Sequence, residues 1–456
     1  MASPKREQFG SRLAVIFAMA GSAIGLGNIW RFPYMVGENG GGAFILLYAV
    51  ATVLISLPVF FAEMMIGRRS RTCAYGAMSK LAPDRKIWRF AGVMAVIVPL
   101  VIASYYSVIG GWSLEFLFKS FSGDIINASP DEADNLFSEF VSSGWLPVIM
   151  HLMFMAVSVY IVANGVKSGI ERFSKITIPA LFVLIIMMIV YSVSLPDAMD
   201  GVKYLVNPDF SQINPRSFAY AMGQSFYSLS LGMGTIITYG SYVSRDENIV
   251  VSGVGTAVFD MLFALLAGFA IMPAVFAAGM EPGCGPGLVF QSVPFIFSTL
   301  GVDYPIISLA VSISFFLAIV VAAMTSLISL LEVGVSYLVE YCSMGRKRAS
   351  VLLFCLCGGL GTICSLSLGP MSSLTVGGKP FFDFLDWISS NILLPILAMC
   401  AVIFVGFVLR KSEVRDELTN SDRLKVNGKI FGFVYFLIKW VAPVAVTLLF
   451  ISNFII

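Results

Sequence analysis

Eleven apolar stretches recur along the sequence, each long enough for a membrane-spanning helix, and two of them, 88–118 and 305–341, exceed the thickness of a bilayer and must tilt or project into water. A helix needs about 20 mostly apolar residues to cross the hydrocarbon core of a bilayer. We therefore predict an all-α integral membrane protein with eleven transmembrane helices. A shorter apolar stretch, 288–300, contains Pro294 and predicts a loop helix on the outer face. The approximate limits of the eleven spans are 12–35, 42–66, 88–118, 146–163, 173–195, 217–243, 250–278, 305–341, 349–367, 383–409 and 431–455.

The composition excludes several classes of protein. Hydrophobic residues make up 58% of the 456 residues and charged residues only 12%, against about 25% charged residues in ordinary soluble domains. A disordered chain, a nucleic-acid-binding protein and a water-soluble enzyme are therefore excluded. The single histidine, His151, leaves little for histidine-based catalysis or a histidine-rich metal site. The chain has no G-x-x-x-x-G-K-[ST] run, so we expect neither a bound nucleotide nor a nucleotide-driven pump.

Basic residues are unevenly distributed between the predicted loops. Most of the 29 lysines and arginines lie before the first span or in every second loop after it, whereas loop 119–145 carries mainly acidic residues. Because loops rich in lysine and arginine stay in the cytoplasm, the N-terminus is predicted to be cytoplasmic. An odd number of crossings then places the C-terminus outside, in a multi-pass protein of the plasma membrane.

Two predicted spans contain glycine-rich runs that would weaken a helix. Residues 21–28 of the first span include three glycines, and residues 228–234 of the sixth include two. Each glycine weakens a helix by about 1 kcal/mol relative to alanine, and unwound backbone inside a bilayer is tolerated only where it lines a cavity or is buried by protein. The alternative is that unbroken helices pack closely through small residues, as the spacing of Gly21 and Gly25 allows.

The two runs lie five spans apart, each in the first span of a group of five. A shift by an odd number of spans reverses the orientation in the membrane, so the two groups would form an inverted repeat. Paired glycine-interrupted spans of this kind point to a transport site at the middle of the bilayer.

Two carboxylates, Asp260 and Glu63, lie deep in other spans. A carboxylate there costs at least ~2.5 kcal/mol and indicates a functional site, although Glu63 could instead snorkel towards the basic side.

Three segments resemble signatures of the neurotransmitter:sodium symporter family. They are residues 21–33 (GSAIGLGNIWRFP) in the first helix, residues 38–44 (ENGGGAF) after it, and residues 224–232 (QSFYSLSLG) in the sixth helix. The resemblance implies a LeuT-type fold, with a 5+5 inverted repeat and discontinuous helices 1 and 6. It implies a transporter core at 1–410, with repeats at about 1–200 and 201–410, followed at 411–456 by a cytoplasmic loop and the eleventh helix.

The resemblance further implies a sodium-coupled symporter, not an enzyme, that uses two sodium ions. Thr325 and Ser326 are among the implied sodium ligands. The alternative is that their hydroxyl groups donate hydrogen bonds to backbone carbonyls of their own helix and bind no cation. Many family members have asparagine at the position of Asp260 and bind chloride nearby, so the aspartate predicts transport without chloride. The implied sodium ligands are Ala23, Asn28, Ser228 and Asp260 at the first site, and Gly21, Ile24, Ala322, Thr325 and Ser326 at the second.

The resemblance also places a substrate beside the two breaks. Monoamine-transporting members have aspartate at the position of Gly25, so the glycine predicts a substrate with its own carboxylate, an amino acid. The apolar side chains predict hydrophobic substrates, aliphatic or aromatic, although each would also be an ordinary core residue. The implied substrate-binding residues are Gly25, Leu26, Gly27, Ile102, Tyr106, Tyr227, Ser230, Met233 and Leu330.

Four charged residues resemble the gates of the family. Arg31 and Asp386 correspond to the extracellular pair, with Tyr227 as an aromatic lid beneath them. Arg6 and Glu340 correspond to the intracellular pair. Next to the intracellular pair this chain has Phe9, where members of the family usually have tryptophan.

The fifth helix carries a sequence feature of its own. Gly169 and Pro179 predict a helix that can unwind, because a proline removes one backbone hydrogen bond and disfavours helix just before it.

A proton-coupled amino-acid permease of the same architecture is the alternative to sodium coupling, because Asp260 and Glu63 could titrate. The expected partners are a hydrophobic amino acid and the lipid bilayer, not nucleic acid.

Overall fold

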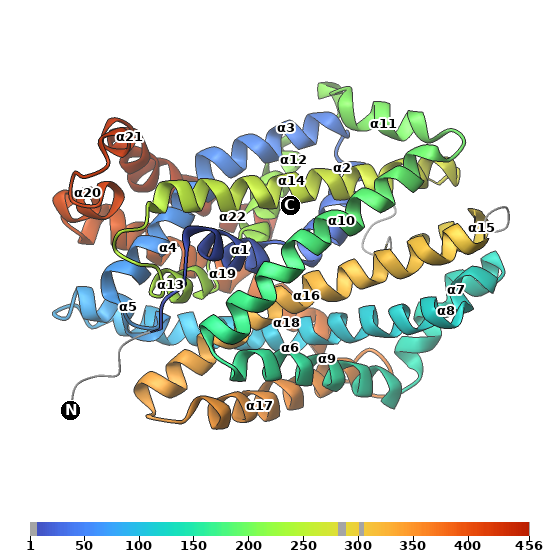
Figure 1. Ribbon diagram of the computed structural model, residues 1–456, viewed down its shortest axis with the longest axis horizontal. Coiled ribbons are helices and arrows are strands. Elements are labelled where there is room, and N and C mark those ends of the chain that lie inside the picture. The colour runs from blue at the N-terminus through green and yellow to red at the C-terminus, as the bar shows by residue number, and fades with distance from the viewer. Residues whose placement is uncertain (1–6, 281–288, 301–304, 456) are drawn as a thin grey trace.

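The computed structural model describes residues 7–280, 289–300 and 305–455, and most of these residues are helical (Figure 1). The long helices run roughly along the long axis of the molecule, with α5, α20 and α21 at one end and α7, α8, α11 and α15 at the other. We call the first of these the basic end, because its loops carry Arg85, Lys86, Arg415 and Arg423. The strands of the described ranges, β1 (Thr375–Val376) and β2 (Lys379–Pro380), form an antiparallel hairpin.

The helices fall into membrane-spanning and loop segments, and several contain π-helical turns, labelled η. The spanning segments are α1 (Arg12–Ala23), η1 (Gly27–Arg31), α2 (Phe32–Glu38), α3 (Gly42–Ala51), η2 (Thr52–Ser56), α4 (Leu57–Ser70), α6 (Ile87–Ser122), α9 (Trp145–Ala163), η3 (Val166–Glu171), α10 (Arg172–Ser194), α12 (Pro215–Ser228), α13 (Thr235–Gly240), α14 (Ile249–Ala277), α16 (Pro305–Tyr341), α17 (Arg346–Leu366), α18 (Phe381–Ile388), η6 (Ser389–Leu393), α19 (Leu394–Ile403), η7 (Phe404–Val408), α21 (Lys425–Phe436), η8 (Leu437–Val441) and α22 (Ala442–Ile455). The loops contain α5 (Ala74–Leu81), α7 (Asp124–Asn127), α8 (Pro130–Ser142), α11 (Ala198–Val206), the 3-10 turn η4 (Phe210–Gln212), α15 (Ser292–Leu300) and α20 (Lys411–Thr419).

Nine helical segments in the described ranges are long and apolar enough to cross a membrane, and α1 with η1 and α2 forms a tenth that is bent by 57°. These segments correspond to ten of the predicted spans. The predicted sixth span, 217–243, is divided into α12 and α13. Neither half alone has the length of a crossing helix, because residues 229–234 between them are not helical.

Both glycine-rich runs interrupt a helix. α1 ends at Ala23, and Ile24 is extended with a ψ angle of 105°. In the sixth span Ser230, Gly232 and Gly234 have φ angles of 53°, 71° and 68°, a region that favours glycine. A Cβ atom at Gly232 would lie 2.3 Å from the backbone carbonyl oxygen of Leu394. The predicted breaks are confirmed, and the alternative of unbroken helices packed through small residues is wrong.

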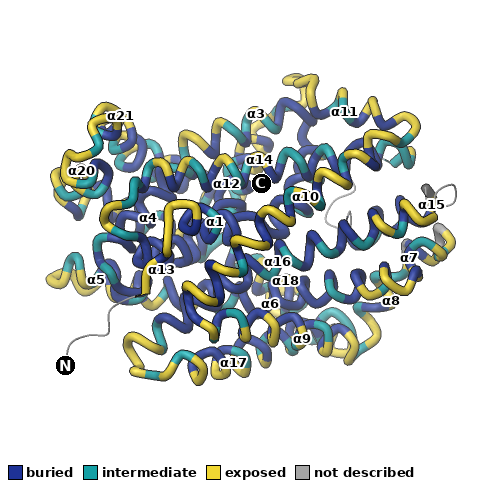
Figure 2. The backbone as a smooth tube through the Cα atoms, in the orientation of Figure 1, coloured by how far each residue is buried: buried dark blue, intermediate teal, exposed yellow. Residues whose placement is uncertain are grey.

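Long central helices form the interior, and other helices surround them. α6 packs along α16 and α9, and α10 packs along α14. Residues between the helices are buried, whereas the outer faces of the peripheral helices are exposed (Figure 2). Many exposed side chains are large and apolar, such as Tyr160 at 71% and Val190 at 67%, as expected for a surface that contacts lipid.

The fifth predicted span forms one continuous helical segment from Val166 to Ser194. Gly169 lies in η3, and Pro179 lies inside α10. A Cβ atom at Gly169 would lie 2.1 Å from the carbonyl oxygen of Ile161, so this glycine allows η3 to approach α9 closely. The predicted unwinding is therefore not present in this conformation.

The start of α1 and the end of α22 make contacts in different parts of the bundle. Arg12 is paired with Glu247 at the basic end, at a distance of 2.6 Å. Asn453 of α22 donates to the carbonyl oxygen of Asn391 and lines a cavity together with Arg31, which follows the break in helix 1. The cytoplasmic N-terminus and the outside C-terminus stay predictions.

Candidate substrate and cation site

The two helix breaks meet around a small cavity lined mostly by buried residues. Helix 1, α6, the sixth span and α16 all contribute to its wall. Leu26 is the one implied substrate residue that does not line the cavity, and its backbone N–H donates to the Tyr106 hydroxyl at 3.3 Å. The lining residues are Ser22, Ala23, Gly25, Gly27, Ile102, Tyr106, Tyr227, Ser230, Met233, Ser326 and Leu330.

One side of this cavity is polar and the other apolar. A Cβ atom at Gly25 would lie 2.5 Å from Ser326 Oγ and 2.9 Å from the Tyr106 hydroxyl, so the glycine keeps both groups close to the backbone of the break. The apolar part of the lining consists of the buried side chains of Ile102, Met233 and Leu330. The cavity lining includes no charged side chain. A zwitterionic group at the polar side and an apolar group at the other would match these walls.

Asp260 of α14 lies at the centre of a polar cluster next to the breaks. Its carboxylate accepts hydrogen bonds from Asn28 Nδ2 at 2.8 Å, from Ser228 Oγ at 2.8 Å and from the Tyr48 hydroxyl at 3.3 Å. Asn28 Nδ2 also donates to Ser228 Oγ at 3.2 Å. The structure therefore brings three of the four residues implied for the first sodium ion into contact, and Ala23 lines the adjacent cavity.

Within the described ranges, the Asp260 carboxylate has no basic partner. The residue is fully buried, and none of the ion pairs among the described residues includes it. A buried charge without a compensating charge is strongly unfavourable. Oxygen atoms of a carboxylate, a hydroxyl and an amide are suitable ligands for a hard monovalent cation, which would supply the missing positive charge.

Tyr48 of α3 is a member of this cluster that the sequence did not reveal. Its hydroxyl donates to both Ser228 Oγ and Asp260 Oδ2 at 3.3 Å. A tyrosine in a span is most often an interfacial residue. The sequence signal that could have found it is weak, because nothing near Tyr48 distinguishes it from an interfacial tyrosine.

A second polar cluster joins α16 to the break in helix 1. Thr325 Oγ1 and Ser326 Oγ each lie 3.4 Å from the carbonyl oxygen of Ile24. Thr325 Oγ1 also donates to the Ala322 carbonyl at 2.8 Å, so the back-bonding alternative describes part of its geometry. A Cβ atom at Gly21 would lie 3.5 Å from Thr325 Cβ. All five residues implied for the second sodium ion are thus neighbours.

Two buried side chains bind backbone groups at the breaks: the N–H of Gly232, and the carbonyl of Gly27, which also accepts the backbone N–H of Phe32. Glu63 Oε1 accepts a hydrogen bond from the N–H of Gly232 at 2.7 Å, and Gln224 Nε2 donates to the Gly27 carbonyl at 2.8 Å. Glu63 is 1% exposed, which is inconsistent with the snorkelling alternative. These contacts hold the broken segments in place inside the membrane.

The predicted outer gate is not an ion pair in this conformation. No Arg31–Asp386 contact within 4.0 Å is present, and the Arg31 guanidinium instead lies 5.2 Å from the ring centroid of Tyr227. A second cavity, lined by Arg31, Tyr227 and Asn391 among others, occupies this region. The ring of Tyr227 therefore lines both this outer cavity and the buried one. The assignment of Arg31 and Asp386 to the outer gate stays a prediction.

At the basic end, Arg6 lies outside the described residues, so the predicted Arg6–Glu340 pair has no described geometry. Glu340 accepts hydrogen bonds from Thr72 Oγ1 and from the backbone N–H of Cys73. The ring of Phe9 packs edge-on against Tyr239 at 5.8 Å. An aromatic residue at position 9 thus contacts the sixth span.

A buried ion pair at the same end was not predicted. Glu332 is fully buried, and both of its carboxylate oxygens accept hydrogen bonds from the Arg346 guanidinium. The Tyr242 hydroxyl donates to Glu332 Oε1 at 2.7 Å. The rule that drew attention to Asp260, a carboxylate within an apolar span, applies equally to Glu332 and could have found it.

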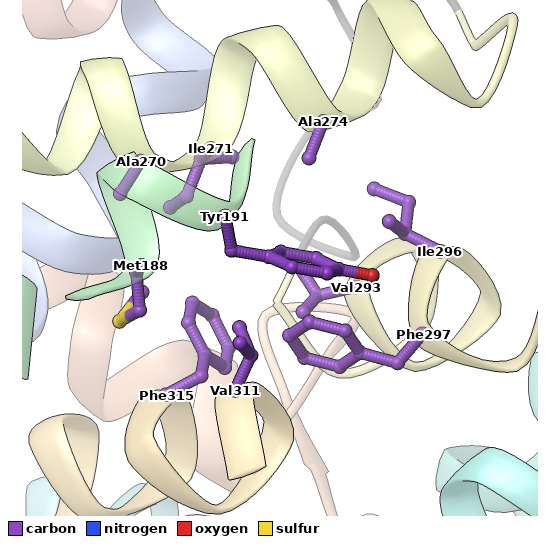
Figure 3. A pocket seen from close by; sticks show the side chains of 10 residues that line it. All are labelled: Met188, Tyr191, Ala270, Ile271, Ala274, Val293, Ile296, Phe297, Val311 and Phe315. Carbon is purple, nitrogen blue, oxygen red and sulfur yellow. The ribbon is translucent and has the colours of Figure 1, made fainter. Parts of the chain in front are cut away.

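A third cavity has a purely structural character. It lies between α10, α14, α15 and α16, and its ten lining side chains are all apolar or aromatic (Figure 3). The Tyr191 hydroxyl is 3.4 Å from Ser308 Oγ. The lining of this cavity includes no charged side chain, and the Tyr191 hydroxyl is its one side-chain polar group.

Comparison with known proteins identifies the family of this chain. The model of the sodium:neurotransmitter symporter family matches residues 6–135 and 131–456. An uncharacterized sodium-dependent transporter of Bacillus subtilis (strain 168), YhdH, is 37% identical over 453 residues, covering 99% of this chain and 98% of the relative. An uncharacterized sodium-dependent transporter of Haemophilus influenzae is 38% identical over 463 residues, covering 98% of each chain.

A solved structure has the same architecture. The crystal structure of MhsT in complex with L-phenylalanine has a TM-score of 0.88 and 40% identity, and the match covers 98% of this chain and 100% of that one. The LeuT-type fold with discontinuous helices is thereby confirmed. The chain therefore belongs to the sodium:neurotransmitter symporter family, and it is a multi-pass, sodium-coupled membrane transporter and not an enzyme.

Proposed function

We propose that this protein couples two sodium ions, without chloride, to the transport of hydrophobic L-amino acids across the plasma membrane. The observation that carries the proposal is the position of Asp260. This buried carboxylate has no basic partner in the described part of the chain and lies where the two broken helices meet. The cation it requires would be sodium, and the carboxylate would supply the negative charge that chloride supplies in other members.

Each sodium ion would be bound by one of the two polar clusters. At the Asp260 cluster, Asn28 presents its nitrogen to the carboxylate and its Oδ1 to the N–H of Gly25. Binding of a cation would rotate this amide so that Oδ1 becomes a ligand. At the second cluster, the hydroxyls of Thr325 and Ser326 and the Ile24 carbonyl already converge.

The substrate would lie in the cavity between the clusters. Its carboxylate would lie beside Gly25, where the Tyr106 hydroxyl is in reach and the start of η1 provides a favourable helix dipole. The apolar side chain of the substrate would contact Ile102, Met233 and Leu330. Because the side chain of Met233 is unbranched and flexible, it would accommodate substrate side chains of several sizes. MhsT, whose crystal structure contains L-phenylalanine, is consistent with such a substrate.

Alternating access would operate around this cavity. Tyr227 separates the buried cavity from the one that contains Arg31, so a rotation of its ring would open or close the outer path. At the basic end, which we assign to the cytoplasm, Glu7 accepts a hydrogen bond from the N–H of Val166, and the N–H of Gly10 donates to Glu171. These contacts fasten the segment before α1 to η3 and would have to break for inward release.

Uptake into proteoliposomes tests this function directly. An inward sodium gradient should drive saturable uptake of aliphatic and aromatic amino acids from a panel of twenty, and replacement of chloride by gluconate should leave the rate unchanged. Uptake driven by an inward proton gradient without sodium would favour the permease alternative. Collapse of uptake in gluconate would contradict chloride independence.

Pro179→Ala is expected to slow uptake several-fold while leaving sodium-dependent substrate binding unchanged. The reason is that α10 covers the second cluster, since a Cβ atom at Gly21 would lie 3.3 Å from Ser174 Oγ and 3.5 Å from Ile178 Cδ1. Alanine restores a backbone hydrogen bond that proline removes, so unwinding at this point becomes harder. Paired measurements of uptake rate and equilibrium binding check the prediction.

Pro273→Ala is the matched control, because this proline also lies inside a helix, α14, but does not belong to either polar cluster. It should leave both quantities unchanged. Wild-type uptake by the Pro179 variant would contradict the proposed role of the fifth helix.

A further inference from the structure

Lys439 is a charged residue in the last span that the transport site does not use. It lies in η8, within the spanning segment Lys425–Ile455, and none of the ion pairs among the described residues includes it. Its ammonium lies 4.9, 5.6 and 5.8 Å from the ring centroids of Phe407, Tyr435 and Trp440. A charged residue inside a span is a candidate for a functional site.

The backbone around Lys439 is specialised on both helices. η8 packs against η7 of the preceding span, and short π-helical turns of this kind occur frequently at functional sites. A Cβ atom at Gly406 in η7 would lie 3.1 Å from Lys439 Cα. The glycine therefore lets the stem of the lysine lie directly on the neighbouring helix, with its ammonium near the end of that span at Val408.

A second lysine approaches the same aromatic ring. The Lys411 ammonium lies 5.8 Å from the ring centroid of Tyr435. Both lysines line an open cavity at the basic end. Of the carboxylates of α20, Glu413 pairs with Arg69 and Glu417 pairs with Arg68, each at 2.7 Å, and Asp416 is exposed and does not line the cavity. Two ammonium groups thus face one cavity whose lining contains no carboxylate.

We propose that this cavity binds the phosphate of an anionic phospholipid from the leaflet at the basic end. Phosphate oxygens match two unpaired ammonium groups, and basic pockets between spans on the cytoplasmic side are suited to anionic headgroups. The flanking side chains favour a lipid over a soluble phosphate. Phe436 and Trp440 are 53% and 55% exposed on the outer surface, where they would contact the acyl chains. The bound lipid would bridge η7 and η8.

Native mass spectrometry of the purified full-length chain with added dioleoyl phosphatidylglycerol or phosphatidylcholine tests this site. The wild type should bind phosphatidylglycerol more tightly than phosphatidylcholine. Lys439→Gln and Lys411→Gln should each weaken phosphatidylglycerol binding by about fivefold, with phosphatidylcholine binding unchanged. Lys429→Gln, an exposed lysine of the same helix, is the matched control and should bind like the wild type.

Equal binding of the two lipids, or an equal loss in the Lys429 control, would overturn the proposal and indicate a general interfacial attraction. Displacement of phosphatidylglycerol by millimolar inorganic phosphate would assign the site to a soluble anion instead, and would also overturn it. Sodium-driven uptake by the two variants in phosphatidylcholine vesicles shows that they are folded. Lipid binding is measured by mass spectrometry and does not require transport. Failure of this proposal is therefore distinguishable from failure of the proposed transport function.

Discussion

Replacing Asp260 with asparagine is expected to lower the apparent sodium affinity by roughly two to three orders of magnitude when chloride is absent. The carboxylate is buried, and the groups that contact it are the neutral side chains of Asn28, Ser228 and Tyr48. Removing a unit charge about 4 Å from a cation costs about 4 kcal/mol at an effective dielectric constant of about 20. Uptake measured against sodium concentration, in gluconate and in chloride, checks the effect.

Chloride should partly restore uptake by the Asp260 variant, because asparagine recreates the arrangement that the family resemblance associates with chloride. The variant should remain folded, since it loses a buried charge that has no basic partner, and its thermal unfolding without sodium reports this separately. Asp200→Asn, on an aspartate whose side chain is 64% exposed, is the control and should behave like the wild type. A wild-type sodium dependence of the Asp260 variant in gluconate would refute the proposed role.

Gly25→Ala is expected to weaken amino-acid binding by about 5- to 150-fold, which corresponds to roughly 1–3 kcal/mol of overpacking. The added Cβ atom would lie 2.5 Å from Ser326 Oγ and 2.9 Å from the Tyr106 hydroxyl. Both groups would have to move, and the polar side of the cavity would lose the space proposed for the substrate carboxylate. Equilibrium binding of a radiolabelled amino acid at saturating sodium measures the loss.

Gly359→Ala serves as the control for this substitution, because nothing lies within 4 Å of a Cβ atom at that glycine. It is an exposed position in α17, and alanine there should leave binding unchanged. Unaltered binding by the Gly25 variant would mean that the substrate does not use this side of the cavity.

The spans and their two breaks could be predicted because they depend on local properties. A stretch of apolar residues sets the position of a crossing helix, and glycine runs such as 21–28 and 228–234 weaken a helix wherever they occur. Asp260 was also detectable, since a carboxylate in an apolar span is conspicuous. The residues around the cavity were implied by family resemblance, and the structure brings eight of the nine into one lining.

Other parts of the site depend on how distant spans cross, which the sequence does not encode locally. Tyr48 reaches Ser228 and Asp260 only because the second, sixth and seventh spans meet at one depth. The position of Arg31 over the ring of Tyr227, at 5.2 Å from its centroid, likewise depends on how the first and sixth spans cross. The π-helical turns η7 and η8 have no periodicity that distinguishes them from ordinary helix, so the surroundings of Lys439 could not be anticipated.

Equilibrium binding of sodium-22 to the purified protein, with and without a hydrophobic amino acid, tests the central claim most directly. The two polar clusters at the helix breaks predict saturable binding of two ions per chain in the presence of substrate. The Asp260→Asn variant in chloride-free buffer should retain only one, at the cluster of Thr325 and Ser326. A wild type without saturable sodium binding, or a variant with the full wild-type stoichiometry and affinity, would contradict the account.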